Sequence, residues 1–216
     1  MQDIVLVGFG GHAKSVADTI ERQGLYRIVG YTDIAPADIC PYPYLGTDTA
    51  LPSIFEGGVH HAAVGIGYIG KGDIRDRMFA TLKSIGYTLP VIADPTAVIS
   101  PTATVGEGSF IGKYAVINAA ATVGNMTIIN TRATVEHDCR VGDFAHVSVG
   151  TVLCGTVTVG ARTFVGAGAA VIQGIAIGAN TVIGAGTVVA KPVADNIVLY
   201  NARQNIVTAN NGKDTP

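Results

Sequence analysis

Residues 135–153 read VEHDCRVGDFAHVSVGTVL, and every sixth residue in this stretch is aliphatic. The same spacing continues in both directions without a break. The sixteen positions are Ile99, Val105, Ile111, Ile117, Val123, Ile129, Val135, Val141, Val147, Leu153, Val159, Val165, Val171, Ile177, Ile183 and Val189. A six-residue period fits neither an α-helix nor a simple two-residue strand alternation. It is typical of a solenoid of short parallel strands, in which one aliphatic side chain of each hexad points inward.

The residue after each aliphatic position repeats over a longer period. It is glycine at residues 106, 124, 142, 160 and 178, which lie 18 residues apart, and never glycine at residues 100, 118, 136, 154, 172 and 190. A third class, at residues 112, 130, 148, 166 and 184, is glycine only in part. These three classes predict a coil with three sides and three distinct corners, and the constant glycine indicates a backbone that needs positive φ or close approach. We expect a triangular prism about five coils tall, with coils roughly 4.8 Å apart.

Composition excludes several classes of protein. With 14 Lys and Arg against 16 Asp and Glu, the chain lacks the basic footprint of a nucleic-acid-binding protein. Its cysteines, Cys40, Cys139 and Cys154, form no CxxC pair, which argues for a reducing compartment and against a disulfide or zinc framework. Residues 1–8 are too short for a signal peptide, and no apolar run is long enough for a bilayer. We expect a cytoplasmic protein that binds neither metal nor membrane.

A βαβ unit is expected before the hexads. Residues 4–7 and 26–31 predict strands, and residues 15–22 predict the helix between them. The intervening turn reads Gly8-x-Gly-x-x-Ala13, with Asp33 about 20 residues further on. Such a turn lets a diphosphate approach backbone amides at a helix N-terminus, and the acid can accept hydrogen bonds from a ribose or a base. The alternative is that these glycines only permit close helix–strand packing. Too few βαβ units are present for a full NAD-binding fold.

A second glycine-rich turn at Gly67–Gly72 follows a third expected strand and precedes a helix over about residues 73–84. Residues 34–58 are expected to be mostly loop, and residues 87–91 a strand. The hexads begin beyond Asp94-Pro95. We therefore divide the chain into a small Rossmann-like α/β domain at residues 1–92 and an all-β hexad domain with a C-terminal tail at residues 93–216.

His137 lies between Glu136 and Asp138, where the glycine rule is relaxed. A carboxylate beside an imidazole orients it and favours its protonated form, as a general base requires. The alternative is an exposed solenoid histidine without a role. His146 is nine residues further on, half of an 18-residue coil, so it points away from His137 within one chain. If both serve one site, they come from different chains. A three-sided prism suits a threefold arrangement, although cyclic dimers are the general expectation.

Three small residues lie where coil stacking brings them near a ligand. Gly155 is 18 residues after His137, so its backbone amide can donate to a developing oxyanion one coil away. Ala167 and Ala185 are also one coil apart and leave room for an extended ligand. Simple coil packing is the alternative for all three.

The sequence combines Gly8-x-Gly-Gly-His12, the hexads, Glu136-His-Asp-Cys139 and Phe144-Ala-His-Val-Ser-Val-Gly150. This combination resembles the sialic acid O-acetyltransferase and bacillosamine N-acetyltransferase family, over nearly the whole chain. These are left-handed β-helix, hexapeptide-repeat acyltransferases with an N-terminal Rossmann-like domain. The resemblance implies a nucleotide-sugar bound in the N-terminal domain and acetyl-CoA lying between adjacent β-helices of a homotrimer. It also implies the left hand of the solenoid, which periodicity alone does not give.

The resemblance also implies roles for individual residues. His137 matches the general base, and Asp138 the acid that raises its basicity, a position where the family often has Glu. The acetyl-CoA site is matched by His146, Gly155, Ala167 and Ala185, and the sugar-nucleotide site by Gly10, Gly11, His12, Ala13, Asp33 and Gly67. The tail departs from the family pattern Gly-x-Pro-Ala-Lys, because it reads Leu199-Tyr-Asn-Ala-Arg203. Arg203 would have to replace the lysine as a phosphate partner, and the two side chains are not interchangeable.

The activity that this resemblance implies is acetyl-CoA-dependent acetylation of the amino group of a nucleotide-linked 4-amino-4,6-dideoxysugar, in the biosynthesis of bacterial surface glycans such as the O-antigen of lipopolysaccharide. Direct transfer needs no acyl-enzyme, and Cys139 and Cys154 are interpreted as small buried hydrophobes. Two alternatives stay open at this point: O-acetylation of sialic acid, and a non-catalytic scaffold that binds a sugar nucleotide. One acid and a glycine turn do not discriminate among UDP, dTDP and GDP.

Overall fold

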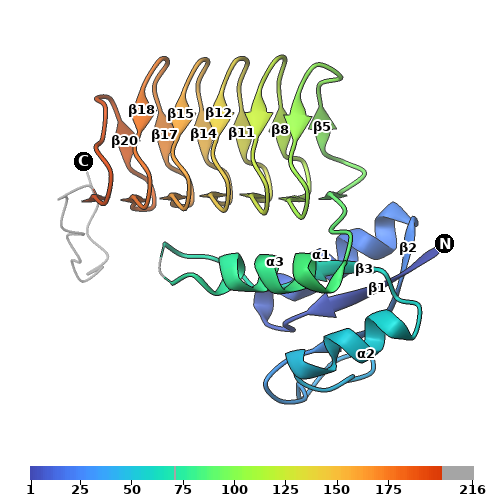
Figure 1. Ribbon diagram of the computed structural model, residues 1–216. Helices are drawn as coiled ribbons and strands as arrows, with labels where there is room; N and C mark the ends of the chain where they lie inside the picture. The colour runs from blue at the N-terminus through green and yellow to red at the C-terminus, as the bar shows by residue number, and fades with distance from the viewer. Residues whose placement is uncertain (71, 201–216) are drawn as a thin grey trace, which may run out of the picture.

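The computed structural model describes residues 1–70 and 72–200. Figure 1 shows a small α/β part, coloured blue to green, lying beside a tall prism of stacked coils that runs from green to red. An N-terminal α/β domain is followed by a left-handed parallel β-helix, as the hexads predict for the solenoid and the family resemblance implies for its hand. The boundary between residues 92 and 93 stays a prediction.

The α/β part is a three-stranded parallel sheet with helices on both faces. The sheet order is β2 (Tyr26–Thr32), β1 (Gln2–Val7), β3 (His61–Val64). Successive side chains of β1 point to opposite faces of the sheet. Ile4 and Leu6 therefore pack with α1 (Gly11–Gln23), and Val5 and Val7 pack with α3 (Ile74–Ile85). This α/β layering holds the glycine-rich turn after β1 at the carboxyl edge of the sheet.

One local prediction for the α/β part was incomplete and another was wrong. The expected loop at residues 34–58 contains η1 (Asp48–Ala50) and α2 (Leu51–Glu56). Pro52 lies in the first turn of α2, where the N–H that proline lacks would have no partner within the helix. The expected strand at residues 87–91 is reduced to one bridge between Thr88 and His61.

The β-helix has three faces, each a parallel sheet of two-residue strands. Face 1 contains β4 (Ile92–Ala93), β7 (Phe110–Ile111), β10 (Ile128–Ile129), β13 (His146–Val147), β16 (Phe164–Val165), β19 (Val182–Ile183) and β21 (Val198–Leu199). Face 2 contains β5 (Val98–Ile99), β8 (Val116–Ile117), β11 (Thr134–Val135), β14 (Val152–Leu153), β17 (Ala170–Val171) and β20 (Val188–Val189). Face 3 contains β6 (Thr104–Val105), β9 (Thr122–Val123), β12 (Arg140–Val141), β15 (Thr158–Val159) and β18 (Ala176–Ile177).

The prism is taller than the five coils expected, because β4 and β21 extend face 1 to seven strands. The second residue of each strand points inward and builds one continuous aliphatic core. The corner glycines are explained by close approach: a Cβ at Gly142 would lie 2.7 Å from the Ala161 nitrogen of the next coil. Positive φ falls two residues later, on non-glycine residues such as Phe144, at 59°.

The outward side chains make the three faces different. On face 1 most of them are covered by the α/β part: Phe110 is only 5% exposed, whereas Val198 in the last strand is 63% exposed. On face 3 they are mostly polar: Thr104, Thr122, Arg140, Thr158 and Ala176. On face 2 they are mostly apolar and open to solvent, with Val98 63% and Val188 60% exposed. Among the helices of residues 1–70 and 72–200, none is long and apolar enough to cross a bilayer.

Candidate active site

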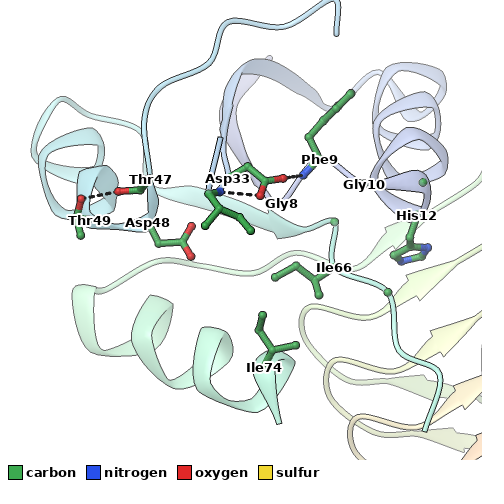
Figure 2. A pocket seen from close by; sticks show the side chains of 14 residues that line it. Gly8, Phe9, Gly10, His12, Asp33, Thr47, Asp48, Thr49, Ile66 and Ile74 are labelled. Atoms are coloured by element: carbon green, nitrogen blue, oxygen red, sulfur yellow. Dashed lines mark hydrogen bonds between the residues drawn. The ribbon is translucent and has the colours of Figure 1, made fainter. Parts of the chain in front are cut away.

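A pocket of about 680 Å³ opens where β1, β2 and β3 end. Ligands of parallel α/β sheets bind at this edge, beside the helix N-termini. Its walls come from the turn after β1, the segment after β2, η1 and the turn after β3 (Figure 2). They are formed by Gly8, Phe9, Gly10, Gly11, His12, Asp33, Ile34, Thr47, Asp48, Thr49, Gly65, Ile66, Gly67 and Ile74.

The glycines of this pocket divide into two kinds. Gly8 has φ +82°, and a Cβ there would lie 2.7 Å from the Ile66 side chain, so this glycine is needed for packing. Gly65 approaches Ala13 equally closely, and Ala13 is fully buried against the sheet. Gly10 and Gly11 have nothing within 4 Å of an added Cβ. These two leave backbone amides at the start of α1 accessible to an anion.

Asp33 shapes the turn after β1. Its Oδ2 accepts a 2.7 Å hydrogen bond from the Phe9 amide, and its Oδ1 accepts one from Ile34 (Figure 2). The carboxylate therefore fixes the loop that carries Gly10, and each oxygen keeps a lone pair that can face a ligand.

A second pocket of about 540 Å³ adjoins the first and shares His12 and Gly67 with it. It lies between the α/β part and face 1, and is lined by His12, Ser15, Gly67, Tyr68, Ile69, Asn130, Thr131, His146 and Val149. The His12 ring packs edge-on against Phe110, and its Nε2 is buried without a partner among the described residues. Burial, with smaller contributions from Arg75 and His146, lowers the pKa of His12 to about 3, so the ring is uncharged at neutral pH.

His146 is buried, with 7% exposure, and fully bonded. Its Nδ1 lies 2.5 Å from the Tyr68 carbonyl and its Nε2 3.1 Å from the Asn130 amide nitrogen. Because burial lowers the pKa of His146 to about 4, the ring is neutral, with the proton on Nδ1 donated to Tyr68. Asn130 is held in turn by the Thr131 amide, which donates to its Oδ1.

His137 lies at the corner between faces 2 and 3, with half of its side chain exposed. Its Nδ1 is 2.8 Å from Asp138 Oδ2, and its backbone amide donates to Glu136. Asp138 has φ 60°, a left-handed conformation that Asp tolerates better than most residues. The acid thus orients the ring and leaves Nε2 directed outward from this pair.

Apart from His146, which lies in a strand of face 1, the sequence-predicted residues of the β-helix fall into two groups at opposite edges of face 2. His137 and Gly155 share the corner toward face 3, and an added Cβ at Gly155 would lie 2.6 Å from His137 Nε2. Ala167 and Ala185 share the corner toward face 1, where the Gly186 amide donates to the Ala167 carbonyl. Within one chain these groups do not meet. Arg203 lies outside the described residues.

Sequence reasoning missed Asn130, Thr131 and Tyr68 as pocket residues. Only the absence of glycine at residue 130 set that coil apart, and nothing in the hexads indicates that Tyr68 reaches His146. Among residues 1–70 and 72–200, no cluster of His, Cys, Asp and Glu has the geometry to hold a metal ion.

Comparisons with known proteins bear on this architecture. Residues 3–82 match a family model described as the PglD N-terminal domain, and residues 156–191 match the hexapeptide repeat of succinyl-transferase. The chain is similar to perosamine N-acetyltransferase from Caulobacter crescentus, solved in complex with CoA and GDP-perosamine. Identity is 35% over 93% of this chain and 94% of that chain, with a TM-score of 0.88.

It is also similar to the acetyltransferase domain of PglB from Neisseria gonorrhoeae in complex with acetyl coenzyme A. Identity is 30% over 93% of this chain and 96% of that chain, with a TM-score of 0.86. WeeI from Acinetobacter baumannii, 21% identical with a TM-score of 0.83, shares the fold. A search of curated protein sequences found no match.

Proposed function

The chain belongs to the family of hexapeptide-repeat sugar N-acetyltransferases with a PglD-type N-terminal domain, and from that premise we propose the substrates and the chemistry. The donor is acetyl-CoA, and the acceptor is the 4-amino group of a nucleotide-linked 4-amino-4,6-dideoxysugar. The observation that carries the proposal is the pair of adjoining pockets that share His12 and Gly67, one at the α/β sheet edge and one against the β-helix.

The first pocket suits the nucleotide diphosphate. Accessible amides at Gly10 and Gly11 and the N-terminus of α1 favour an anion there. The sugar then extends past His12 and Gly67 into the second pocket. Its amino group is therefore delivered to the β-helix, beside Asn130 and His146.

The acetyl-transfer site is completed by a second chain. Face 2 is exposed and mostly apolar, whereas face 3 is mostly polar and most of face 1 is covered. Burying face 2 around a threefold axis stabilises an assembly by the hydrophobic effect. This arrangement sets the corner that carries His137 in one chain against the corner that carries Thr131 and Val149 in the next. The homotrimer thus explains why His137 and the second pocket lie at opposite edges of the same face.

His137 acts as the general base. It takes a proton from the sugar amine as nitrogen attacks the thioester carbonyl, and Asp138 stabilises the imidazolium that forms. The Gly155 amide, which has no acceptor among the described residues, donates to the oxyanion. Collapse of the tetrahedral intermediate breaks the carbon–sulfur bond, and the imidazolium returns its proton to the CoA thiolate. Ala167 and Ala185 leave the groove open for the pantetheine arm.

The test is thiol release from acetyl-CoA with UDP-, dTDP- and GDP-linked 4-amino sugars and with free sialic acid, for the wild type and His137→Ala. We expect turnover on one amino sugar that collapses in the variant. His60→Ala, an exposed histidine before β3, is the matched control and should keep full activity. Turnover on sialic acid alone would establish O-acetylation instead. Binding of a nucleotide sugar without any thiol release would mean a scaffold.

A further inference from the structure

Arg75 is a buried cation that joins the two halves of the molecule. It lies in the first turn of α3 and is only 2% exposed. Its Nη1 donates a 2.5 Å hydrogen bond to the Ile66 carbonyl, and its Nη2 donates one of 2.5 Å to the Met126 carbonyl. Ile66 belongs to the turn after β3 and lines the first pocket, whereas Met126 is a corner residue of the β-helix. One guanidinium therefore connects the sugar-nucleotide pocket to the solenoid.

A charged arginine side chain is energetically unfavourable at this buried position. Burying a guanidinium without a carboxylate partner is strongly unfavourable unless other acceptors satisfy its donors. No ion pair to Arg75 occurs in the described part of the chain, and its Nε has no partner there. The other buried positions of α3, Met78 and Leu82, are apolar. An apolar side chain of similar size would fill the same space. What arginine adds at this position is a planar group that donates two hydrogen bonds in a fixed geometry.

The turn that Arg75 holds is the wall between the two pockets. Gly65, Ile66 and Gly67 line the first pocket, and Gly67 and Tyr68 line the second. The same turn is tied to the β-helix at Tyr68, whose carbonyl accepts from His146 and whose hydroxyl donates 2.7 Å to the Arg162 carbonyl. Arg75 thus fixes the upstream end of a segment whose downstream end is held by the solenoid.

We propose that Arg75 is a positioning residue for acetyl transfer: by tying Ile66 to Met126 it fixes the sugar-nucleotide pocket relative to the thioester, so that the acceptor amine arrives within reach. This inference rests on the proposed function. A displacement of about 1 Å at a reacting centre costs on the order of 10²-fold in rate. The charge of Arg75 also helps to lower the pKa of His12 and His146, which keeps both rings neutral beside the acceptor.

The experiment compares Arg75→Met, which keeps the packing volume, and Arg75→Lys, which keeps the charge but not the fork. Arg77→Met is the matched control, because Arg77 is an exposed residue of the same helix paired only with Asp73. We expect kcat to fall on the order of 10²-fold in Arg75→Met and less in Arg75→Lys, as misplacement of about 1 Å predicts. The affinity of each protein for GDP or UDP alone, and for CoA, should be unchanged, as should kcat in Arg77→Met.

A readout independent of turnover is hydrogen–deuterium exchange of the peptide that spans residues 65–70, measured on the full chain. We expect faster exchange in Arg75→Met than in the wild type or Arg77→Met. Wild-type kcat and unchanged exchange in Arg75→Met would overturn the inference while leaving the proposed function standing. If Arg75→Met does not fold, wild-type kcat and exchange in Arg75→Lys would overturn it equally. A wild type that acetylates no amino sugar would refute the proposed function. The exchange measurement would still test whether Arg75 holds the segment that contains Ile66.

Discussion

The imidazole of His137 lies directly over Gly155, one coil further along the β-helix. A Cβ added to Gly155 would be 2.6 Å from His137 Nε2 and 2.7 Å from its Cε1. Gly155 does not have positive φ, so its backbone conformation does not require glycine. The absence of a side chain instead leaves room for the His137 ring. The nitrogen proposed to accept the amine proton is thereby placed beside a backbone amide that can stabilise the oxyanion.

Gly155→Ala should displace the His137 ring without unfolding the coil. The exposed ring can rotate away from the new methyl group, but it then loses its hydrogen bond to Asp138 and the orientation of Nε2. We expect kcat to fall by about 10²-fold, the cost of a misplaced catalytic group. Steady-state kinetics and thermal melting check this. Cys154→Ala, the adjacent substitution, is the control and should keep kcat. Full activity in Gly155→Ala would refute a role for this corner.

Val152→Asp should dissociate the proposed trimer. Val152 lies in the middle of face 2 and is 38% exposed in the single chain, so a trimer would bury a carboxylate there. We expect sedimentation to give the mass of one chain, with an intact circular dichroism spectrum. Activity should fall by about 10²–10⁴-fold, the contribution of a general base that now lacks its pocket.

The control for this substitution is Thr158→Asp, which adds the same charge to face 3. It should leave both mass and activity unchanged. A wild type that sediments as one or two chains, or a fully active Val152→Asp protein, would contradict the shared site.

Gly10→Val should weaken nucleotide-sugar binding alone. Gly10 has φ −88° and ψ −165°, an extended conformation that valine adopts readily, and nothing lies within 4 Å of its Cβ. The fold should therefore tolerate the change, while two methyl groups occupy the space proposed for the diphosphate. A loss of about 1.4 kcal/mol or more in the binding free energy of the sugar nucleotide would raise its KM at least tenfold. Unchanged KM would favour a purely structural role for the turn. The KM for acetyl-CoA serves as the internal control.

The hexad pattern predicted the solenoid, its three faces and the aliphatic core, because each coil buries side chains in a strictly local register. The same register predicted that Gly155 stacks on His137 and that His146 points away from it. The pattern did not predict Arg75 or Tyr68, because their partners lie 51 and 94 residues away in sequence. Contacts between an α/β unit and a repeat depend on how whole surfaces fit, and no local period encodes them. For the same reason the sequence did not indicate helix α2, which is held by tertiary packing of Leu51.

Replacing both Cys139 and Cys154 with alanine should leave the chemical step intact. Cys139 is fully buried, as expected, its Sγ is 3.1 Å from the Cys154 carbonyl, and burial raises the pKa of its thiol. Cys154 is only partly buried, so the expectation of a buried side chain was wrong for this residue. A buried, protonated thiol is a poor nucleophile. We expect single-turnover acetyl transfer at the wild-type rate, with a stability loss of roughly 1 kcal/mol from the small cavity. Complete loss of that step in a folded double variant would instead establish a covalent acyl-enzyme.

The buried histidines should make the protein less stable in mild acid. The pKa of His146 is lowered to about 4 in the folded state, against about 6.5 for an unfolded histidine, because burial disfavours its charged form. Between these two pKa values the unfolded state binds more protons than the folded state. The contribution of His146 to the free energy of unfolding is therefore fully present above pH 6.5 and is lost as the pH falls toward 4. The slope approaches about 1.4 kcal/mol per pH unit for each such group. His12, with its pKa near 3, adds to it in the same direction.

His146→Asn isolates this contribution, because the asparagine amide takes the place of Nδ1 and can still donate to the Tyr68 carbonyl but does not titrate. Urea denaturation at pH 7, 6 and 5 should show a variant that is less stable than the wild type at pH 7. Its free energy of unfolding should nevertheless fall less steeply with acid, by about 1.4 kcal/mol per pH unit. The two curves should therefore converge as the pH approaches 5. Parallel curves would mean that His146 is not held neutral by the fold, and the hydrogen bonds from Asn130 and to Tyr68 would then need a different protonation state.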